Sequence, residues 1–283
     1  MGSWREEGRT AVITGGASGI GLSAGEHYAR AGMNVLVADV DTEAIQQALP
    51  RLEAAADGRG RVEARTCDVS DPEQVDALRD TAFELFGGVH CLMNNAGVGI
   101  PCGAPWQSLD ELRQTLGTNL LGVIHGCHAF IPRMLEAGEP GVVINTASKQ
   151  GITRPPGNYA YNLSKAGVVA YTESVAHAFV AEDGCQLSAH LLVPGFVYTG
   201  MVSRWIPEKP EFAWTADQTV EFMLPCLDRG DFYILCPDNE TPREVDEKRI
   251  RWNAGDLVEN RPALSRWHPD YQEAFAAWME DDS

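Results

Sequence analysis

Positive charge, long apolar runs and paired cysteines are all scarce in this sequence of 283 residues. Lysine and arginine number 22 against 40 acidic residues, which gives a formal net charge of −18. Nucleic acids and anionic membranes attract basic surfaces, so this balance argues against both as partners. No apolar run reaches the roughly 18 residues of a membrane-spanning helix. The amino-terminal residues lack the apolar core of a signal peptide, and we therefore expect a cytoplasmic protein.

The cysteines are scattered, and no two of them form a Cys-x-x-Cys pair. They are Cys67, Cys91, Cys102, Cys127, Cys185, Cys226 and Cys236. We expect free buried thiols rather than disulfides or a zinc site. His125 and His128 lie on one helical stretch, but no further ligand spacing completes a metal site around them. We interpret these histidines as packing or interface residues and expect no metal.

Short β-branched runs alternate with segments of helical pattern along the whole chain. This alternation predicts a single Rossmann-type α/β domain, doubly wound around a seven-stranded parallel sheet. The strands are expected at residues 10–14, 34–39, 62–67, 89–93, 141–147, 185–193 and 231–236. A continuous helical stretch is expected from about Leu109 to Ala137, and a further helix carries Tyr161 and Lys165.

A glycine-rich turn, Thr14-Gly-Gly-Ala-Ser-Gly-Ile-Gly21, separates the first strand from the helix that follows it. Backbone N–H groups in such a turn and the dipole of the next helix both attract phosphate. Glycine also lets the backbone approach a pyrophosphate closely. Ordinary tight turns use glycine as well, so it is the position between strand and helix that favours a nucleotide site.

An acid, Asp39, ends the second strand 18 residues after Gly21. A carboxylate at this place can accept hydrogen bonds from the adenosine ribose hydroxyls, and it repels a 2′-phosphate. The next residues, Val40 and Asp41, offer no cation that could hold such a phosphate. The site therefore favours NAD over NADP. A helix N-cap is the alternative role, for Asp41 more than for Asp39.

Small and polar residues also follow the other predicted strands. They are Asp68-Val69, Asn94-Asn-Ala-Gly97, Ser148 and Pro194-Gly195. Ligands of open α/β sheets bind outside the carboxyl ends of the strands, so these residues are expected to line one crevice. Asparagine and glycine are common in plain turns too, which is the alternative interpretation.

Tyr161 and Lys165 are four residues apart, a spacing that places both side chains on one face of a helix. A phenol has an ordinary pKa near 10, and a neighbouring ammonium favours its ionised form. The pair therefore predicts a tyrosine that transfers a proton, although a solvated surface pair has the same spacing. Tyr159 has a leucine, not a lysine, four residues after it.

Taken together, these motifs resemble the short-chain dehydrogenase/reductase family over about residues 8–240. The resemblance implies hydride transfer between a nicotinamide cofactor and a secondary alcohol or ketone. It implies that Tyr161 is the general acid/base, that Lys165 lowers its pKa, and that Ser148 orients the substrate oxygen. Asn119 would support Lys165 by holding a water. A nucleotide-sensing protein without catalysis is the alternative, but such proteins usually lack the tyrosine or the lysine.

The resemblance also implies contacts with NAD, or with NADP as the alternative cofactor. The expected contact residues are Gly15, Ser18, Gly19, Ile20, Gly21, Asp39, Asp68, Val69, Asn95, Ala96, Gly97, Tyr161, Lys165, Pro194, Gly195, Val197 and Thr199. By analogy with the family, the helices of Asn119 and Tyr161 would pair copies of the chain into a homodimer or homotetramer.

Residues 196–214 are rich in large apolar side chains and are expected to form a lid over a bulky, apolar or aromatic substrate. The candidate substrate contacts are Gln150, Phe196, Tyr198, Met201 and Trp205, although core packing would explain the aromatic residues as well. We assign residues 1–283 to one domain. It consists of a dinucleotide-binding core at 8–240 and an extension at 237–283, which we expect to pack on its own subunit or on a neighbour.

Overall fold

A parallel sheet of seven strands forms the centre of the computed structural model, which describes residues 4–204 and 206–280. The strand order is β3-β2-β1-β4-β5-β6-β9. The strands are β1 (Thr10–Thr14), β2 (Asn34–Asp39), β3 (Val62–Thr66), β4 (Cys91–Asn94), β5 (Gly141–Thr146), β6 (Leu187–Val193) and β9 (Tyr233–Leu235). The predicted doubly wound α/β domain is confirmed, and the predicted strand ends differ from the observed ones by two residues or fewer.

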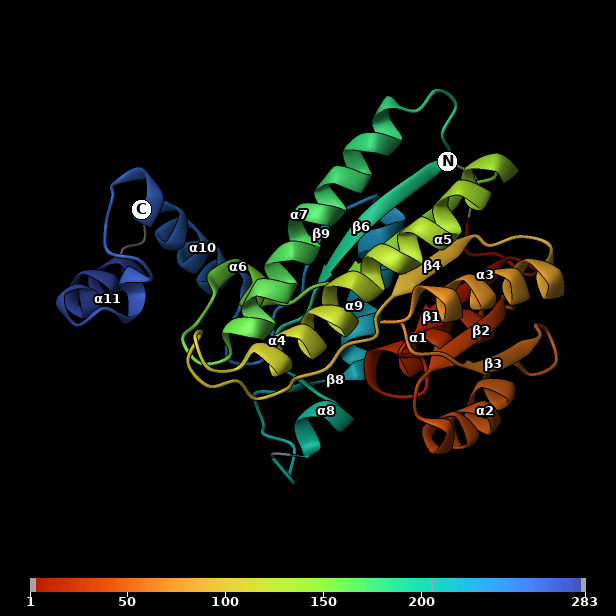
Figure 1. Ribbon diagram of the computed structural model, residues 1–283, viewed down its shortest axis with the longest axis horizontal. Helices are drawn as coiled ribbons and strands as arrows, with labels where there is room; N and C mark the ends of the chain where they lie inside the picture. Colours follow the sequence, from red (N-terminus) through yellow and green to blue (C-terminus); the bar gives the residue numbers. More distant parts are fainter. Residues whose placement is uncertain (1–3, 205, 281–283) are drawn as a thin grey trace.

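Helices cover both faces of the sheet, with α5 and α7 lying side by side across the front in Figure 1. The helices of the core are α1 (Gly19–Arg30), α2 (Thr42–Ala56), α3 (Pro72–Phe86), α4 (Leu109–Leu116), α5 (Gly122–Ala137), α6 (Lys149–Thr153), α7 (Tyr159–Ala181) and α9 (Ala216–Arg229). Alternate strand residues face opposite layers. Ile13 packs with α1, α2 and α9, whereas its neighbour Val12 packs with α3, α5 and α7. Burial on both faces explains why the strands are almost continuously apolar.

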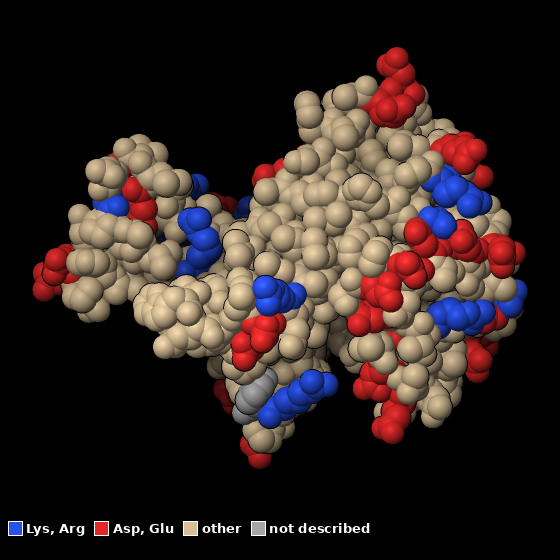
Figure 2. Space-filling view, viewed as in Figure 1, with Lys and Arg blue, Asp and Glu red and all other residues tan. Residues whose placement is uncertain are grey.

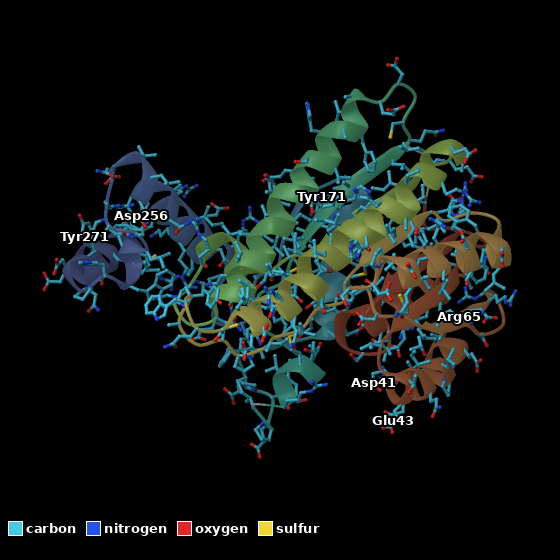
Figure 3. All side chains as sticks on the ribbon, in the orientation of Figure 1. Asp41, Glu43, Arg65, Tyr171, Asp256 and Tyr271 are labelled. Carbon is cyan, nitrogen blue, oxygen red and sulfur yellow. The ribbon has the colours of Figure 1, made fainter. Side chains whose placement is uncertain are left out.

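Two aspartates lie at the carboxyl end of β2, and one of them caps the next helix. The Asp41 side chain, labelled in Figure 3, accepts hydrogen bonds from the backbone N–H groups of Glu43 and Ala44 and so caps α2. Asp71 caps α3 in the same way, with Pro72 at the start of that helix. Asp39 caps no helix, which leaves its carboxylate for another role.

The helical stretch expected from Leu109 to Ala137 is interrupted by a π turn, η1 (Gly117–Leu121). The backbone N–H of Gly122 bonds the carbonyl of Gly117, five residues earlier. Asn119 lies inside this turn and is fully buried. Single π turns within α-helices are frequent at functional sites.

Residues 196–214 are more ordered than the sequence indicates. They contain β7 (Val197–Tyr198) and α8 (Gly200–Ser203), and β7 pairs with β8 (Trp214–Thr215) in a second, two-stranded sheet. Trp205, one of the candidate substrate contacts, lies outside the described residues.

The carboxyl-terminal extension projects from one end of the core (Figure 1). Its elements are α10 (Arg243–Val258), η2 (Ser265–Trp267), η3 (Pro269–Tyr271) and α11 (Gln272–Glu280). The Trp252 ring packs edge-on against Phe275, with centroids 5.3 Å apart, and lies 6.0 Å from the Trp278 ring. The Asn253 side chain donates a hydrogen bond to the carbonyl of Ile152 in α6, so the extension contacts its own core. Among the described residues, no helix is both long and apolar enough to cross a membrane.

Candidate active site

The site lies at the carboxyl ends of β1 and β4, where the strand order of the sheet reverses direction. Thr14 and Asn94 are register partners at the ends of these strands. The Thr14 hydroxyl accepts hydrogen bonds from the backbone N–H groups of Asn95 (3.1 Å) and Ala96 (3.2 Å). The Asn95 side chain in turn donates to the carbonyl of Gly15 at 3.1 Å. These bonds join the glycine-rich turn to the segment after β4, in the crevice where open α/β sheets bind ligands.

The glycine-rich turn forms a cradle that larger residues would fill. Gly15 and Gly19 have left-handed backbones, with φ of +61° and +52°. A Cβ on Gly21 would lie 2.2 Å from the Gly15 carbonyl oxygen, and one on Gly19 would lie 3.0 Å from the methyl group of Thr199. Ser18, the N-cap of α1, makes no side-chain capping bond, and the first turn of α1 contains no acid. Because the first N–H groups of a helix lack partners within it, this cradle fits a phosphate.

Asp39 stands beside this cradle. Its carboxylate accepts hydrogen bonds from the backbone N–H groups of Ala17 (3.2 Å) and Asp41 (3.1 Å). The first of these bonds fixes the carboxylate to the glycine-rich turn, as a contact with an adenosine ribose requires. Arg65 on strand β3 is the register partner of Ala38, the residue before Asp39. We did not expect this cation from the sequence. Arg65 is bound to Glu63 at 3.1 Å.

Asp68 and Val69 follow β3, the strand that lies next to β2 in the sheet. The Asp68 carboxylate accepts hydrogen bonds from the backbone N–H and the hydroxyl of Ser70. Val69 is held against α5, since its carbonyl bonds the His125 ring at 2.8 Å and its side chain fills the space beside Gly122. His125 therefore has a packing role, in line with the expectation for the two histidines.

Ser148 and Tyr161 are brought together from two elements. Ser148 follows β5 and caps the short helix α6, accepting a hydrogen bond from the backbone N–H of Gln150. Tyr161 lies in the first turn of α7, with its side chain near that of Ser148. Burial raises the pKa of Tyr161, and the nearby Ser148 hydroxyl lowers it by less.

Lys165 lies one turn further along α7 and is almost fully buried. Its Nζ donates a hydrogen bond to the Thr146 carbonyl at 2.8 Å and lies 5.8 Å from the centre of the Tyr161 ring. Burial lowers the pKa of Lys165 to about 8. The sequence led us to expect that this lysine lowers the pKa of Tyr161. In the protein chain alone, burial of the phenol is the larger influence, and its pKa is raised.

Asn119 connects the segment after β4 to α7. Its side-chain oxygen accepts from the backbone N–H of Val98 (2.7 Å), and its Nδ2 donates to the Val98 carbonyl and to the Ser164 hydroxyl. A Cβ on Gly97 would lie 3.4 Å from this oxygen and 3.7 Å from the Lys165 Nζ. The expected water-holding role of Asn119 stays a prediction. What the structure shows is a side chain that positions the Gly97–Val98 backbone beside Lys165.

Tyr159 points elsewhere. Its hydroxyl donates a hydrogen bond to the Ser108 carbonyl at 3.2 Å, on the loop before α4. It therefore fixes that loop and does not meet Ser148.

The candidate substrate residues separate into two groups. Met201 and Gln150 are near the site, since the Met201 sulfur lies 3.3 Å from where a Cβ on Gly99 would be and Gln150 is exposed in the first turn of α6. Phe196 packs on Phe212, with ring centres 5.1 Å apart. The Tyr198 hydroxyl donates to the Pro207 carbonyl at 2.6 Å, so this tyrosine stabilises its own segment.

Two threonines were absent from the predicted set of site residues although they organise it. They are Thr14, whose hydroxyl holds the backbone after β4, and Thr146, whose carbonyl holds Lys165. The Thr146 hydroxyl also donates to the Asn95 side chain at 3.4 Å. Both are the last residues of their strands. That position was the available signal, because strand ends at this edge face the crevice.

The family described as short chain dehydrogenase matches residues 9–210 of the chain. The chain is a short-chain dehydrogenase. It is 40% identical to 1-deoxy-11-beta-hydroxypentalenate dehydrogenase of Streptomyces exfoliatus over 92% of this chain and 94% of the relative. It is 35% identical to 3beta-hydroxysteroid dehydrogenase 1 of Eggerthella lenta over 68% of this chain and 72% of that protein.

Solved structures of other proteins share the fold of this short-chain dehydrogenase. A short chain dehydrogenase/reductase from Burkholderia phymatum, solved in complex with NAD, is similar with a TM-score of 0.80 and 32% identity, over 91% of this chain and 96% of that chain. Levodione reductase is similar with a TM-score of 0.73 and 28% identity, over 83% and 98%. The protein is thus an NAD(P)-dependent oxidoreductase that acts on CH–OH groups.

Proposed function

We propose that this short-chain dehydrogenase transfers a hydride between NAD and a bulky, apolar secondary alcohol or its ketone, with Tyr161 as the general acid/base. The observation that carries the proposal is the juxtaposition of the Tyr161 and Ser148 side chains, with the buried ammonium of Lys165 5.8 Å from the centre of the same tyrosine ring. A phenol, a hydroxyl donor and a cation around one point are what proton exchange with an alcohol oxygen requires.

Each side chain has its own part in alcohol oxidation. The Tyr161 phenolate accepts the hydroxyl proton, and Ser148 donates a hydrogen bond that orients the same oxygen. The Lys165 ammonium stabilises the phenolate, and Asn119 holds the Gly97–Val98 backbone in place beside it. NAD, when bound, supplies the hydride acceptor and a positive charge on its nicotinamide ring. Because burial raises the pKa of Tyr161 in the chain alone, we infer that this charge and Lys165 together are needed to ionise the phenol.

The preference for NAD over NADP is proposed on the basis of Asp39. Its carboxylate is fixed to the glycine-rich turn by the N–H of Ala17, and a 2′-phosphate there would meet a negative charge. Arg65 is the cation to weigh against this preference, and its salt bridge with Glu63 reduces its availability for a phosphate. The contacts of NAD with the remaining predicted residues, from Gly15 to Thr199, are part of the same proposal.

The proposed substrate is an alicyclic or aromatic secondary alcohol. Met201 lies across from Gly99, and Phe196 and Phe212 pack together at the base of the same segment, which gives the proposed lid an apolar character. A bulky ring alcohol is also the kind of substrate that the name of the hydroxysteroid relative describes.

The proposed oligomer is a homodimer or homotetramer that buries α5 and α7. Leu121 and Leu163 are 44% and 51% exposed, on η1 and α7, which contact each other. In Figure 2 the middle of the surface over α5 and α7 shows few charged side chains, whereas acidic and basic residues are mixed over α2 and α3. The free thiols of the described residues support a proposed location in the reducing cytoplasm.

Absorbance of NADH during incubation with NAD and a panel of alicyclic, aromatic and steroid alcohols tests this function. We expect turnover of at least one bulky secondary alcohol and little or none of small primary alcohols. Tight NAD binding without turnover of any alcohol or reduction of any ketone would instead favour a catalytically silent nucleotide-binding protein.

A further inference from the structure

A lysine and two carboxylates are gathered behind the Ser148 turn, and the proposed reaction does not use them. The Nζ of Lys149 lies 2.6 Å from the Asp246 carboxylate and 3.4 Å from the Asp238 carboxylate. The side chains of Lys149, Asp238 and Asp246 are 15%, 8% and 6% exposed. We call these three residues the Lys149 cluster.

The Lys149 cluster joins parts of the chain that are far apart in sequence. Lys149 follows Ser148 and begins α6, Asp238 follows β9, and Asp246 belongs to α10 of the extension. The backbone N–H of Lys149 also donates to the Pro194 carbonyl at 3.3 Å. The Asp238 oxygen nearest Lys149 accepts a further bond, from the backbone N–H of Phe196 at 3.2 Å. The serine turn, the beginning of residues 196–214 and the extension therefore meet at one ammonium group.

Removal of any one charged side chain would change the balance of charge in the Lys149 cluster. One ammonium faces two carboxylates, and burial raises the pKa of Asp246 while Lys149 lowers it. Arg249 and Asp238 also act on Asp246, the first favouring its charged form and the second opposing it. Without the lysine, two like charges would remain in a poorly solvated place, an arrangement that is strongly unfavourable.

Little room exists for the Lys149 cluster to rearrange. A Cβ on Gly195 would lie 2.6 Å from the Asp238 carboxylate and 3.1 Å from the Lys149 Nζ. The turn at Pro194–Gly195 is therefore packed directly on the ion pair. A shift of the pair would move this turn, which leads into the proposed substrate segment.

We propose that Lys149 is a positioning residue through which the carboxyl-terminal extension holds the beginning of residues 196–214 against the Ser148 turn, and so sets the width of the substrate site. The assignment of 196–214 to the substrate rests on the proposed function. The mechanical link itself does not. Lys149 follows Ser148 and could be expected to meet a polar group of the substrate, but its ammonium is held by the two carboxylates instead.

Hydrogen–deuterium exchange of the full chain tests the link without any need for activity. In Lys149→Met, the amides of residues 195–204, including the Phe196 N–H, should exchange about tenfold faster or more, because their anchor is lost. The double variant Lys149→Met/Asp246→Asn removes one of the two unpaired charges and should regain part of the protection. Glu247→Gln is the matched control, since it breaks only exposed pairs, with Arg243 and Arg251 on the same helix.

Kinetics then test the consequence for substrate. For a bulky alcohol, kcat/KM should fall about 10- to 100-fold in Lys149→Met, recover in part in the double variant and stay unchanged in Glu247→Gln. The discrimination between bulky and small alcohols should fall with it, which a simple loss of folded protein would not cause. Should Lys149→Met fail to fold, Asp246→Asn takes its place, with a smaller increase in exchange expected.

The outcomes separate the two proposals. Unchanged exchange at 195–204 in a folded Lys149→Met would overturn the link. Faster exchange with no turnover of any alcohol by the wild type would support the link and overturn the proposed function. Faster exchange with an unchanged preference for bulky alcohols would overturn the claim that the Lys149 cluster sets the width of the site.

Discussion

At the scale of single residues, the acid/base assignment depends on which of two neighbouring tyrosines meets Ser148. Tyr161→Phe removes only the hydroxyl that faces this serine, so kcat should fall about 100- to 10,000-fold. NADH affinity, measured by fluorescence titration, should change little. Tyr159→Phe is the matched control, because that hydroxyl bonds the Ser108 carbonyl and its loss should cost at most a few-fold. Equal losses in the two variants would contradict the assignment.

Asp39 and Asp41 allow a similar comparison, of a test variant with a control variant, for the preference between NAD and NADP. Asp39→Asn keeps the shape of the side chain but removes the charge that would repel a 2′-phosphate. The ratio of NAD to NADP affinity should therefore fall about 10- to 100-fold. Asp41→Asn should leave the ratio unchanged, since asparagine caps α2 as well as aspartate does. Titration of both cofactors against both variants measures the ratio, and an equal effect at the two positions would argue against ribose recognition by Asp39.

The buried lysine gives a prediction about pH. Burial lowers the pKa of Lys165 from 10.5 to about 8, so between these values the unfolded chain holds a proton that the folded protein has released. For this group the free energy of unfolding consequently rises with pH across that window, by about 3 kcal/mol. Urea denaturation at pH 8 and pH 10 captures about 2 kcal/mol of this rise. It is measured as the difference between wild type and Lys165→Met, in which other titrating groups cancel. A difference that falls as pH rises would contradict the burial argument.

At the scale of elements, the junction between β1 and α1 depends on the absence of side chains. Gly21→Ala would place a Cβ 2.2 Å from the Gly15 carbonyl oxygen, and overpacking of this kind costs about 1–3 kcal/mol. The turn must shift to relieve it, so NADH affinity should fall about tenfold or more. Gly88→Ala is the control, because its Cβ would have no neighbour nearer than 3.5 Å. Thermal denaturation with and without NADH measures both effects.

The strands and their end residues followed from the sequence because buried parallel strands are short, apolar and bounded by turns. The π turn could not be predicted in the same way. Residues 109–137 carry a continuous helical pattern, and the contacts that fix Asn119, with Val98 and Ser164, come from segments distant in sequence. The two-residue strand Val197–Tyr198 could not be predicted for the same reason, since it forms only by pairing with Trp214–Thr215.

At the scale of the whole molecule, the sequence indicated which residues share the crevice but not how they are supported. Lys149 illustrates the difference. It stands next to Ser148, yet Asp238 and Asp246, almost 90 residues or more further on, neutralise it. This pairing depends on how the extension folds back onto α6, which no local sequence pattern predicts. Within the extension, Trp252 packs with Phe275 and Trp278.

The assembly of the protein can be tested at one exposed leucine. Leu163→Glu places a charge on the apolar surface of α7 and should convert the proposed dimer or tetramer into smaller species. Light scattering after size-exclusion chromatography measures the mass. Leu257→Glu, on α10, is the control for an exposed leucine outside that surface. A wild type that is monomeric, or an assembly that only Leu257→Glu disrupts, would show that α5 and α7 do not form the interface.

The π turn at Gly117–Leu121 has a consequence for how this active site can change over generations. A π turn holds one residue more than the α-helix around it. Loss of a single codon there would merge α4 and α5 into one regular helix while the two flanks keep nearly the same rotation, because the wide turn absorbs the extra residue. The side chains within the turn would be repositioned, and Asn119 would lose its contacts with Val98 and Ser164. The contacts of this asparagine can therefore be gained or lost by insertion and deletion as well as by substitution, with little change to the helices on either side.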